Sequence, residues 1–345
     1  MSEESFYNLQ RNEKVMIFQA ISNQKGMSAF AVEKDWWVSR TLEIIFKMPI
    51  SKHLVFKGGT SLSKAWKLIN RFSEDIDLAI DREFFEGFKG ELSKSKITRL
   101  RKESGAHITG IFFNQLKDEF SKNVFNDLKY KVVETNDSDQ DPRIIEIYYP
   151  NIILHPSEYV LPRVQIEIGC RSLREPFTIQ SFGSLVDELY TGHNFILPKF
   201  DVPTVNPERT FLEKVFLLHE EFRRPSEKIR VDRLSRHMYD IYCLCQAGIN
   251  HNAINNKELY ETIVAHRYKF ARVGGINYNE HSPEIINPIP NLDKLGEWKL
   301  DYAKMVEEMI YDELKPTFEQ LIDNLVELRS QLQNLNWKYE LSFPD

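Results

Sequence analysis

Apolar residues change their spacing near residue 203, and this change divides the sequence into two parts. Before that point, short segments of alternating apolar and polar residues are mixed with segments of helical spacing. After it, the apolar residues recur at the intervals that place them on one face of a helix. The pattern predicts an α+β fold, with a small mixed sheet and flanking helices in residues 1–202 and a mostly helical domain in residues 203–345.

The first part begins with helical spacing over residues 5–50, followed by a short apolar strand over residues 54–56. Gly58 and Gly59 interrupt the pattern, and a helix is expected to follow them over residues 61–70. The segment Asp75–Ile80 has the two-residue alternation of a strand. Further strands are expected over 144–149 and 164–168, after a polar loop over 132–143.

In the second part, Asn206 and Pro207 are typical of a helix start, because asparagine caps and proline fits the first helical position. This helix is expected over residues 208–222. The apolar spacing predicts further helices over 233–245 and over 301–336, the latter interrupted at Pro316.

Two carboxylates lie on one face of a predicted strand. Asp75 and Asp77 are two residues apart, so they share a face, while Ile76, Leu78 and Ile80 share the other. Like charges this close repel each other unless a cation lies between them, and Mg²⁺ binds such pairs together with substrate phosphates. The alternative is a pair of exposed aspartates on an edge strand.

The turn Gly58-Gly59-Thr60-Ser61 follows a strand and opens a helix, a place where backbone N–H groups can hold phosphate. Ser61 can donate its hydroxyl to a ligand or cap the helix. The spacing matches neither a Walker A loop nor a Gly-x-Gly-x-x-Gly fingerprint. An ordinary Gly-Gly turn is the alternative.

A third acid, Glu167, lies on the polar face of the strand expected over residues 164–168. If this strand paired with the Asp75–Ile80 strand, the three acids would come together as a two-metal phosphoryl-transfer site. An ordinary half-exposed strand is the alternative.

These motifs resemble a known family. The segments FKGGTS (56–61) and RFSEDIDL (71–78) are similar to the signature of the AbiEii/AbiGii toxin family of bacterial nucleotidyltransferases, which includes the mycobacterial MenT enzymes. Four other segments resemble further family motifs: 30–40, 211–214, 236–242 and 309–328.

The resemblance implies a polymerase-beta-like nucleotidyltransferase fold and a set of site residues. Asp75 and Asp77 would bind Mg²⁺ or Mn²⁺, with Glu167 as a third metal ligand. Other residues would complete the site: Gly58, Gly59 and Ser61 near the triphosphate, Lys214 on phosphate, and Asp240 in the helical half. From the residues alone, Asp240 faces Arg236 at i−4, so a simple helix-surface ion pair is the alternative.

The implied function is that of a toxin in a type IV toxin–antitoxin, abortive-infection or phage-defence system. Such an enzyme moves a nucleoside monophosphate from an NTP to an RNA acceptor, with the 3′ end of a tRNA as the expected substrate. A winged-helix antitoxin encoded next to it is the expected partner. Two alternatives stay open: nucleotidylation or phosphorylation of a protein, and a catalytically weak toxin that acts through partner binding.

Composition and net charge exclude some classes of function but not the one implied by the resemblance. The 45 Lys+Arg against 51 Asp+Glu give a net charge of −6, which excludes a uniformly basic nucleic-acid-binding surface. Two local basic runs, 94–102 and 223–236, could still contact RNA. Three cysteines are too few for a disulfide framework, and no apolar run is long enough to span a membrane or act as a signal peptide. We therefore expect free thiols and a cytoplasmic location.

Overall fold

The computed structural model describes residues 5–73, 75–154, 161–312 and 315–344. The chain forms two compact units. The first comprises Met1–Ala65 and Phe72–Val205, and the second comprises Trp66–Arg71 and Asn206–Asp345. Sequence reasoning placed the domain boundary after residue 202 and assigned Trp66–Arg71 to the first domain, whereas this short segment is part of the second unit.

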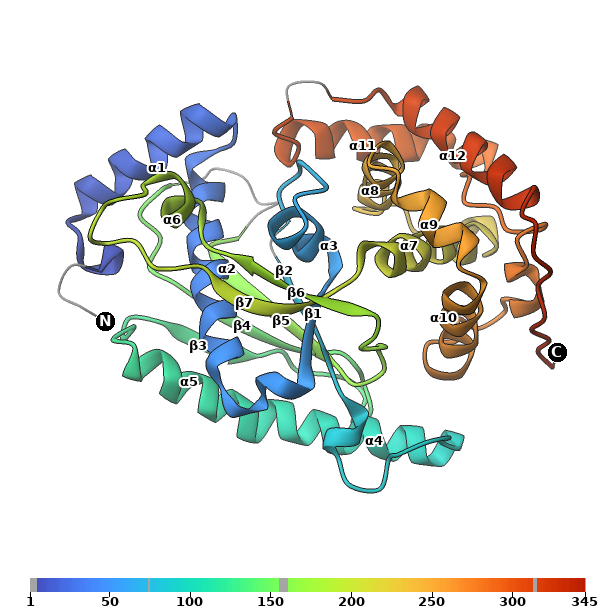
Figure 1. The fold of residues 1–345 in the computed structure, drawn as a ribbon, viewed down its shortest axis with the longest axis horizontal. Coiled ribbons are helices and arrows are strands. Elements are labelled where there is room, and N and C mark those ends of the chain that lie inside the picture. The colour runs from blue at the N-terminus through green and yellow to red at the C-terminus, as the bar shows by residue number, and fades with distance from the viewer. Residues whose placement is uncertain (1–4, 74, 155–160, 313–314, 345) are drawn as a thin grey trace. The chain divides into compact units, whose positions relative to one another are not determined.

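The first unit is built on a seven-stranded mixed sheet in the order β3-β4-β5-β2-β1-β7-β6 (Figure 1). The pairs β2–β5 and β1–β7 are parallel, and the other neighbours are antiparallel. The strands are β1 Leu54–Lys57, β2 Asp75–Ile80, β3 Lys129–Val132, β4 Arg143–Tyr148, β5 Arg163–Gly169, β6 Phe177–Phe182 and β7 Phe200–Val205.

The four strands expected from sequence are confirmed as β1, β2, β4 and β5, whereas β3, β6 and β7 were not predicted. Strand β3 is only a few residues long and carries two lysines. Strand β7 contains Pro203, which disfavours strand in a sequence pattern because proline lacks a backbone N–H. In the structure Pro203 lies opposite Ile179 of the edge strand β6.

The helices of the first unit are α1 Arg11–Lys25, α2 Ala29–Lys47, α3 Gly58–Thr60, α4 Lys94–His107, α5 Phe113–Lys122 and α6 Leu185–Leu189. The helical stretch expected over 5–50 is broken at Gly26, whose φ is +67°, and Ser28 caps the start of α2. The helix expected over 61–70 is shorter. It starts at Gly58 and ends in a π-helical turn, η3, over Ser61–Ala65.

One face of this sheet is aliphatic and fully buried. Helix α2 packs against β2, β5 and β7, and Figure 1 shows it running across the sheet. The buried side chains of this face alternate with the acidic positions predicted from sequence, as the two-residue strand period requires. They include Phe56, Ile76, Leu78, Ile145, Ile147, Val164, Ile166 and Ile168.

The second unit is helical, with α7 Pro207–Phe222, α8 Ser235–Gln246, α9 Ile249–Asn255, α10 Lys257–Phe270, α11 Leu295–Glu308 and α12 Phe318–Gln333. Helix α7 begins at Pro207 after the N-cap Asn206, as expected. The segment Trp66–Arg71 is attached to this unit by its backbone: Arg71 forms a β-bridge with Ile310, and Tyr311 N–H donates to Asn70 O at 3.2 Å.

The three cysteines are free thiols, as expected. Among the described residues, no helix is long and apolar enough to cross a membrane.

Candidate active site

The three predicted acids lie on one face of the sheet, on two adjacent strands. In the parallel register of β2 and β5, Asp77 lies beside Glu167 and Asp75 lies beside Gln165. Residues in register on paired strands point to the same side, so the aliphatic face packs inward and the acids share the opposite face. The strand pairing on which the two-metal interpretation depended is therefore present.

The glycine turn touches this acidic face at one defined point. Gly58 has φ +81°, and a Cβ placed on it would lie 2.0 Å from Oδ2 of Asp77. Any side chain at this position would therefore overlap the Asp77 carboxylate, and an L-residue would also be strained at this φ. Glycine is thus required here because the backbone of the turn lies directly against Asp77.

Hydroxyl groups fix the rest of the turn. Thr60 Oγ1 donates to the backbone oxygen of Asp75 at 2.5 Å, which ties the turn to β2. Ser61 is fully buried and donates its hydroxyl to Gly58 O at 2.8 Å. Ser61 therefore acts within the turn, as the capping reading allowed, and Gly59 lies at the second position of α3. Contacts of Gly59 and Ser61 with a triphosphate stay a prediction.

Lys57 belongs to the FKGGTS motif but was not predicted as a site residue. It ends β1 opposite Asp77 in the antiparallel register, so it shares the acidic face. Within the described part of the chain, neither the Lys57 side chain nor the Asp77 side chain forms a hydrogen bond or an ion pair. Its position at the last residue of the strand before Gly58 was the signal that could have identified it.

The donor set suits Mg²⁺, although the described residues contain no group of three acid, histidine or cysteine side chains already arranged around a metal position. Mg²⁺ binds through one or two carboxylates and completes its shell with water and substrate phosphates. Asp75 and Asp77 supply such a pair. Glu167, which accepts a hydrogen bond from Gln165 Nε2 at 2.9 Å, is the third carboxylate of this face.

The other two predicted site residues meet in the second unit. Asp240 of α8 is completely buried and accepts two hydrogen bonds from Arg71, Nε to Oδ1 at 2.6 Å and Nη2 to Oδ2 at 2.8 Å. Lys214 of α7 lies 2.8 Å from the same Oδ2. The Lys214 ammonium also lies 3.3 Å from Nδ1 of His237. Arg71 and His237 therefore belong to this cluster, although neither was predicted as a site residue.

The surrounding cations determine the ionisation of this cluster. Burial alone would raise the pKa of Asp240, but Arg71 and Lys214 outweigh it and hold that pKa below its usual range. Burial lowers the pKa of Lys214 even though Asp240 opposes this. Burial and the Lys214 charge keep the pKa of His237 well below the ordinary value, so this imidazole is neutral. Neutral Nδ1 can then accept from Lys214.

The surface ion pair of Asp240 with Arg236, the alternative left open by the sequence, is wrong. The ion pairs of Asp240 go to Arg71 and Lys214, which come from distant parts of the sequence. Arg236 makes no ion pair with any described residue, and Arg233 donates its backbone N–H to Asp301 at 2.7 Å. The cluster of Arg71, Lys214, Arg236 and Asp240 thus contains three cations and one carboxylate.

Nearby acids neutralise both basic runs in part. In the run 223–236, Arg223 pairs with Glu280, while Arg224 and Arg230 both pair with Glu221. In the run 94–102, Arg99 pairs with Glu103 and Arg101 with Asp139. Lys94, Lys96 and Lys102 are exposed, and they form no ion pair with any residue that the structure describes. Lys228 of the run 223–236 is likewise exposed and forms no ion pair with a described residue, so both runs keep lysines that no acid neutralises.

An acid-x-acid strand beside a Gly-Gly turn is the arrangement of a nucleotidyltransferase, and comparison with known families agrees. Residues 40–324 match the family described as "Nucleotidyl transferase AbiEii toxin, Type IV TA system", a span that includes every predicted site residue. The chain therefore belongs to the AbiEii family of nucleotidyltransferase toxins, as the sequence motifs predicted.

Other comparisons add less. No curated protein matches the sequence. The crystal structure of JHP933 from Helicobacter pylori is 13% identical, with a TM-score of 0.42, and the match covers 89% of this chain and 93% of that one. A second H. pylori structure, of a candidate nucleotidyltransferase, is 12% identical with the same TM-score and covers 89% and 96%. At these values the similarity carries no functional argument.

Proposed function

We propose that this family member is a cytoplasmic, Mg²⁺-dependent toxin that transfers a nucleoside monophosphate from an NTP to the 3′ end of a tRNA. The observation that carries the proposal is the register of β2 and β5. It brings Asp75, Asp77 and Glu167 onto one sheet face, with the Gly58 turn against Asp77.

In this proposal the acids of the sheet hold the metal. Asp75 and Asp77 would bind Mg²⁺ or Mn²⁺, and Glu167 would be an additional ligand. When bound, the metal supplies charge stabilisation for in-line attack of the acceptor hydroxyl on the α-phosphorus. Lys57 and the turn at Gly59 would hold the triphosphate, because an ammonium group and free backbone N–H groups both bind phosphate oxygens.

The cluster in the second unit would bind anionic groups of the substrates. Its three cations exceed its one carboxylate, so it has a positive surplus that favours phosphate. Lys214 would contact phosphate directly. Asp240 would hold Lys214 and Arg71 in place, since a buried carboxylate between two cations fixes their positions more strongly than a solvated one.

The test is transfer of labelled nucleotide. The purified protein is incubated with Mg²⁺, each of the four α-labelled NTPs in turn, and total tRNA. Labelled RNA that requires Mg²⁺ is expected with one or more of the NTPs. Asp77→Asn should abolish the label without reducing thermal stability, because the Asp77 side chain makes no hydrogen bond or ion pair within the described residues. Persistent labelling by Asp77→Asn would contradict the assignment of the metal site.

The same assay separates the other functions considered from sequence. Label on protein, and not on RNA, would indicate that the acceptor is a protein. Toxicity that persists in Asp75→Ala cells, with no turnover in vitro, would indicate action through partner binding. A winged-helix antitoxin is proposed as the partner, and its co-expression should relieve toxicity.

A further inference from the structure

Three consecutive charged residues on α2 each bind a different distant segment of the first unit. The buried carboxylate of Glu33 accepts the backbone N–H groups of Ile152 and Ile153 at 2.8 and 3.0 Å. Lys34, also buried, donates to Leu161 O at 2.8 Å. Asp35 binds the third segment. These residues lie before residue 40, where the family match begins.

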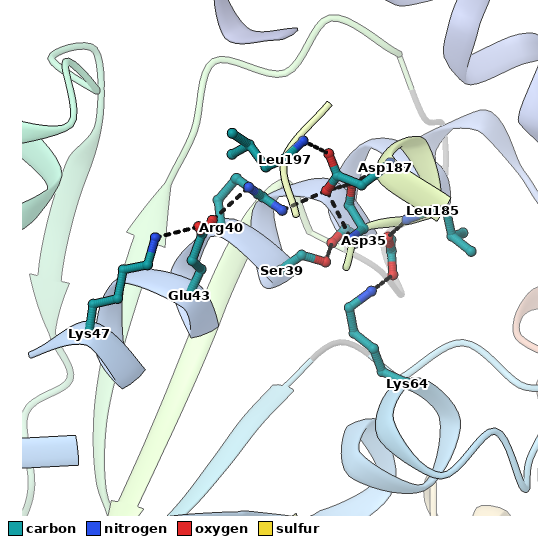
Figure 2. A network of polar contacts seen from close by, with 10 residues as sticks. Asp35, Ser39, Arg40, Glu43, Lys47, Lys64, Leu185, Asp187 and Leu197 are labelled. Atoms are coloured by element: carbon teal, nitrogen blue, oxygen red, sulfur yellow. Dashed lines mark hydrogen bonds and ion pairs between the residues drawn. The ribbon is translucent and has the colours of Figure 1, made fainter. Parts of the chain in front are cut away.

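Asp35 connects α2 to the helical turn that follows the glycines. Its Oδ1 forms an ion pair with Lys64 of η3, and its Oδ2 accepts the backbone N–H of Leu185 at 2.8 Å (Figure 2). The Lys64 side chain is only 8% exposed and its ammonium lies 5.9 Å from the centre of the Phe182 ring. Solvent screening is therefore weak, and losing either charge would leave the other one buried without its partner.

Lys64 is linked to the acidic face by a short series of hydrogen bonds. It belongs to the same π-helical turn as Ser61, which bonds back to Gly58 O at 2.8 Å. The preceding residue, Thr60, bonds to Asp75 O at 2.5 Å. A displacement of Lys64 would therefore move the part of the chain that lies against Asp77.

We propose that Asp35 and Lys64 are positioning residues that hold the Gly58-Gly59 turn in the conformation that binds the nucleotide. The proposal rests on the proposed nucleotidyltransferase function. Neither residue needs to touch the substrate. Their ion pair fixes η3 against α2, and the turn N–H groups are then already oriented for phosphate, which lowers the entropic cost of binding.

The same helix provides a matched control. Arg40, only 2% exposed, donates to Asp187 Oδ2 at 2.6 Å, and the same oxygen accepts the Ser184 hydroxyl (Figure 2). This ion pair is more buried than that of Asp35, and it also joins α2 to the region of α6. Among the described residues, neither Arg40 nor Asp187 forms a hydrogen bond with the glycine turn or with η3. Breaking this ion pair should cost stability without changing the turn.

The experiment compares Asp35→Asn and Lys64→Met with Arg40→Met. Three quantities are measured: the melting temperature, the Kd for Mg²⁺ with a non-hydrolysable NTP analogue, and hydrogen exchange of amides 58–65. All three variants should melt earlier than the wild type. Only Asp35→Asn and Lys64→Met should bind the nucleotide about tenfold more weakly and exchange faster over residues 58–65. Lys64→Arg, which keeps the charge, should recover most of the affinity.

Two results would overturn the inference: equal nucleotide affinity in Asp35→Asn and wild type, or equal weakening in Arg40→Met. Failure of the proposed function gives a different result, because the wild type itself would then bind no nucleotide. Hydrogen exchange over residues 58–65 would still show whether Asp35 and Lys64 hold the turn.

Discussion

Aspartates occur in opposite surroundings in the two units. On the sheet of the first unit, Asp77 is partly exposed and its side chain makes no hydrogen bond or ion pair with a described residue, and Asp75 lies on the same face. In the helical unit, Asp240 is fully buried and bound by Arg71 and Lys214. The Asp77 carboxylate thus forms no ion pair among the described residues, whereas the Asp240 carboxylate forms two.

The difference shows how one residue type can serve two purposes. A carboxylate with no bound cation can accept a metal ion, whereas one already neutralised by two cations serves to hold them. The first kind contributes little to folding and can be replaced at small cost in stability, whereas the second contributes to the stability of its unit. A mutation of the first kind of carboxylate should therefore reduce activity with little loss of stability. A mutation of the second kind should reduce the stability of its unit.

The largest expected effect is on folding of the helical unit. Asp240→Asn would leave Arg71 and Lys214 buried together without their counter-charge, which should cost about 3–5 kcal/mol in the free energy of unfolding. Asp77→Asn should change it by less than about 0.5 kcal/mol, because it removes an unpaired charge next to Asp75. Urea unfolding of both variants measures this difference. Similar losses in the two would refute the contrast.

The next largest effect concerns the contact between the glycine turn and Asp77. Gly58→Ala should displace the carboxylate, abolish metal-dependent activity and cost about 1–3 kcal/mol in unfolding free energy, since its Cβ would overlap Asp77. Gly87→Ala is the control, because its φ of +87° is similar while its nearest neighbour, Arg99, is 3.5 Å away. Equal activity loss in both variants would mean that φ, and not the overlap, matters.

Much of the first site follows from local sequence. The strand Asp75–Ile80 has the boundaries that its alternation predicts, because one buried face fixes the register of such a strand. Glu167 could be placed on the polar face of its own strand by the same rule. Its position beside Asp77 could not be derived, since strand pairing depends on the whole sheet order.

The second site shows where local reasoning ends. Asp240 was recognised through the family motif, but its helix spacing pointed to Arg236, and the actual partner, Arg71, precedes it by 169 residues. Helix and strand periodicity relates only residues that are close in sequence, so it could not predict the contact between Arg71 and α8. Trp66–Arg71 joins the helical unit through a bridge to Ile310, a tertiary contact that no local pattern encodes.

Acid should weaken the helical unit first. Burial lowers the pKa of His219 to about 3, and His237 is likewise shifted well down, so both are neutral when folded. The unfolded chain protonates them near the ordinary pKa of ~6.5. Their stabilising contribution is therefore complete above pH ~6.5 and declines as the pH falls below it, by ~1.4 kcal/mol per pH unit for each histidine.

The first unit should lose less stability over this range. Burial lowers the pKa values of its His53 and His107, but burial raises the pKa of Glu33, and a group with a raised folded pKa favours folding at lower pH. Urea unfolding at about pH 7.5, 6.5 and 5.5, followed by peptide-resolved hydrogen exchange, measures each unit separately. His219→Gln should reduce the acid sensitivity of the helical unit, whereas the exposed His251→Gln should not. Parallel losses in both units would contradict this prediction.

The smallest effect expected tests whether the acidic face also contains the first unit's phosphate-binding cation. Lys57 lies in register with Asp77, so its ammonium can reach an NTP whose metal is held by the aspartates. Lys57→Met should raise the KM for NTP about tenfold, the usual loss for one charged hydrogen bond, and leave the melting temperature unchanged. Lys57→Arg should restore part of the affinity, because the charge is kept.

Lys102→Met on α4 is the matched control, since it removes an exposed lysine of the same unit that forms no ion pair with a described residue. If Lys57→Met lowers kcat at constant KM, the lysine acts on the transition state and not on nucleotide binding.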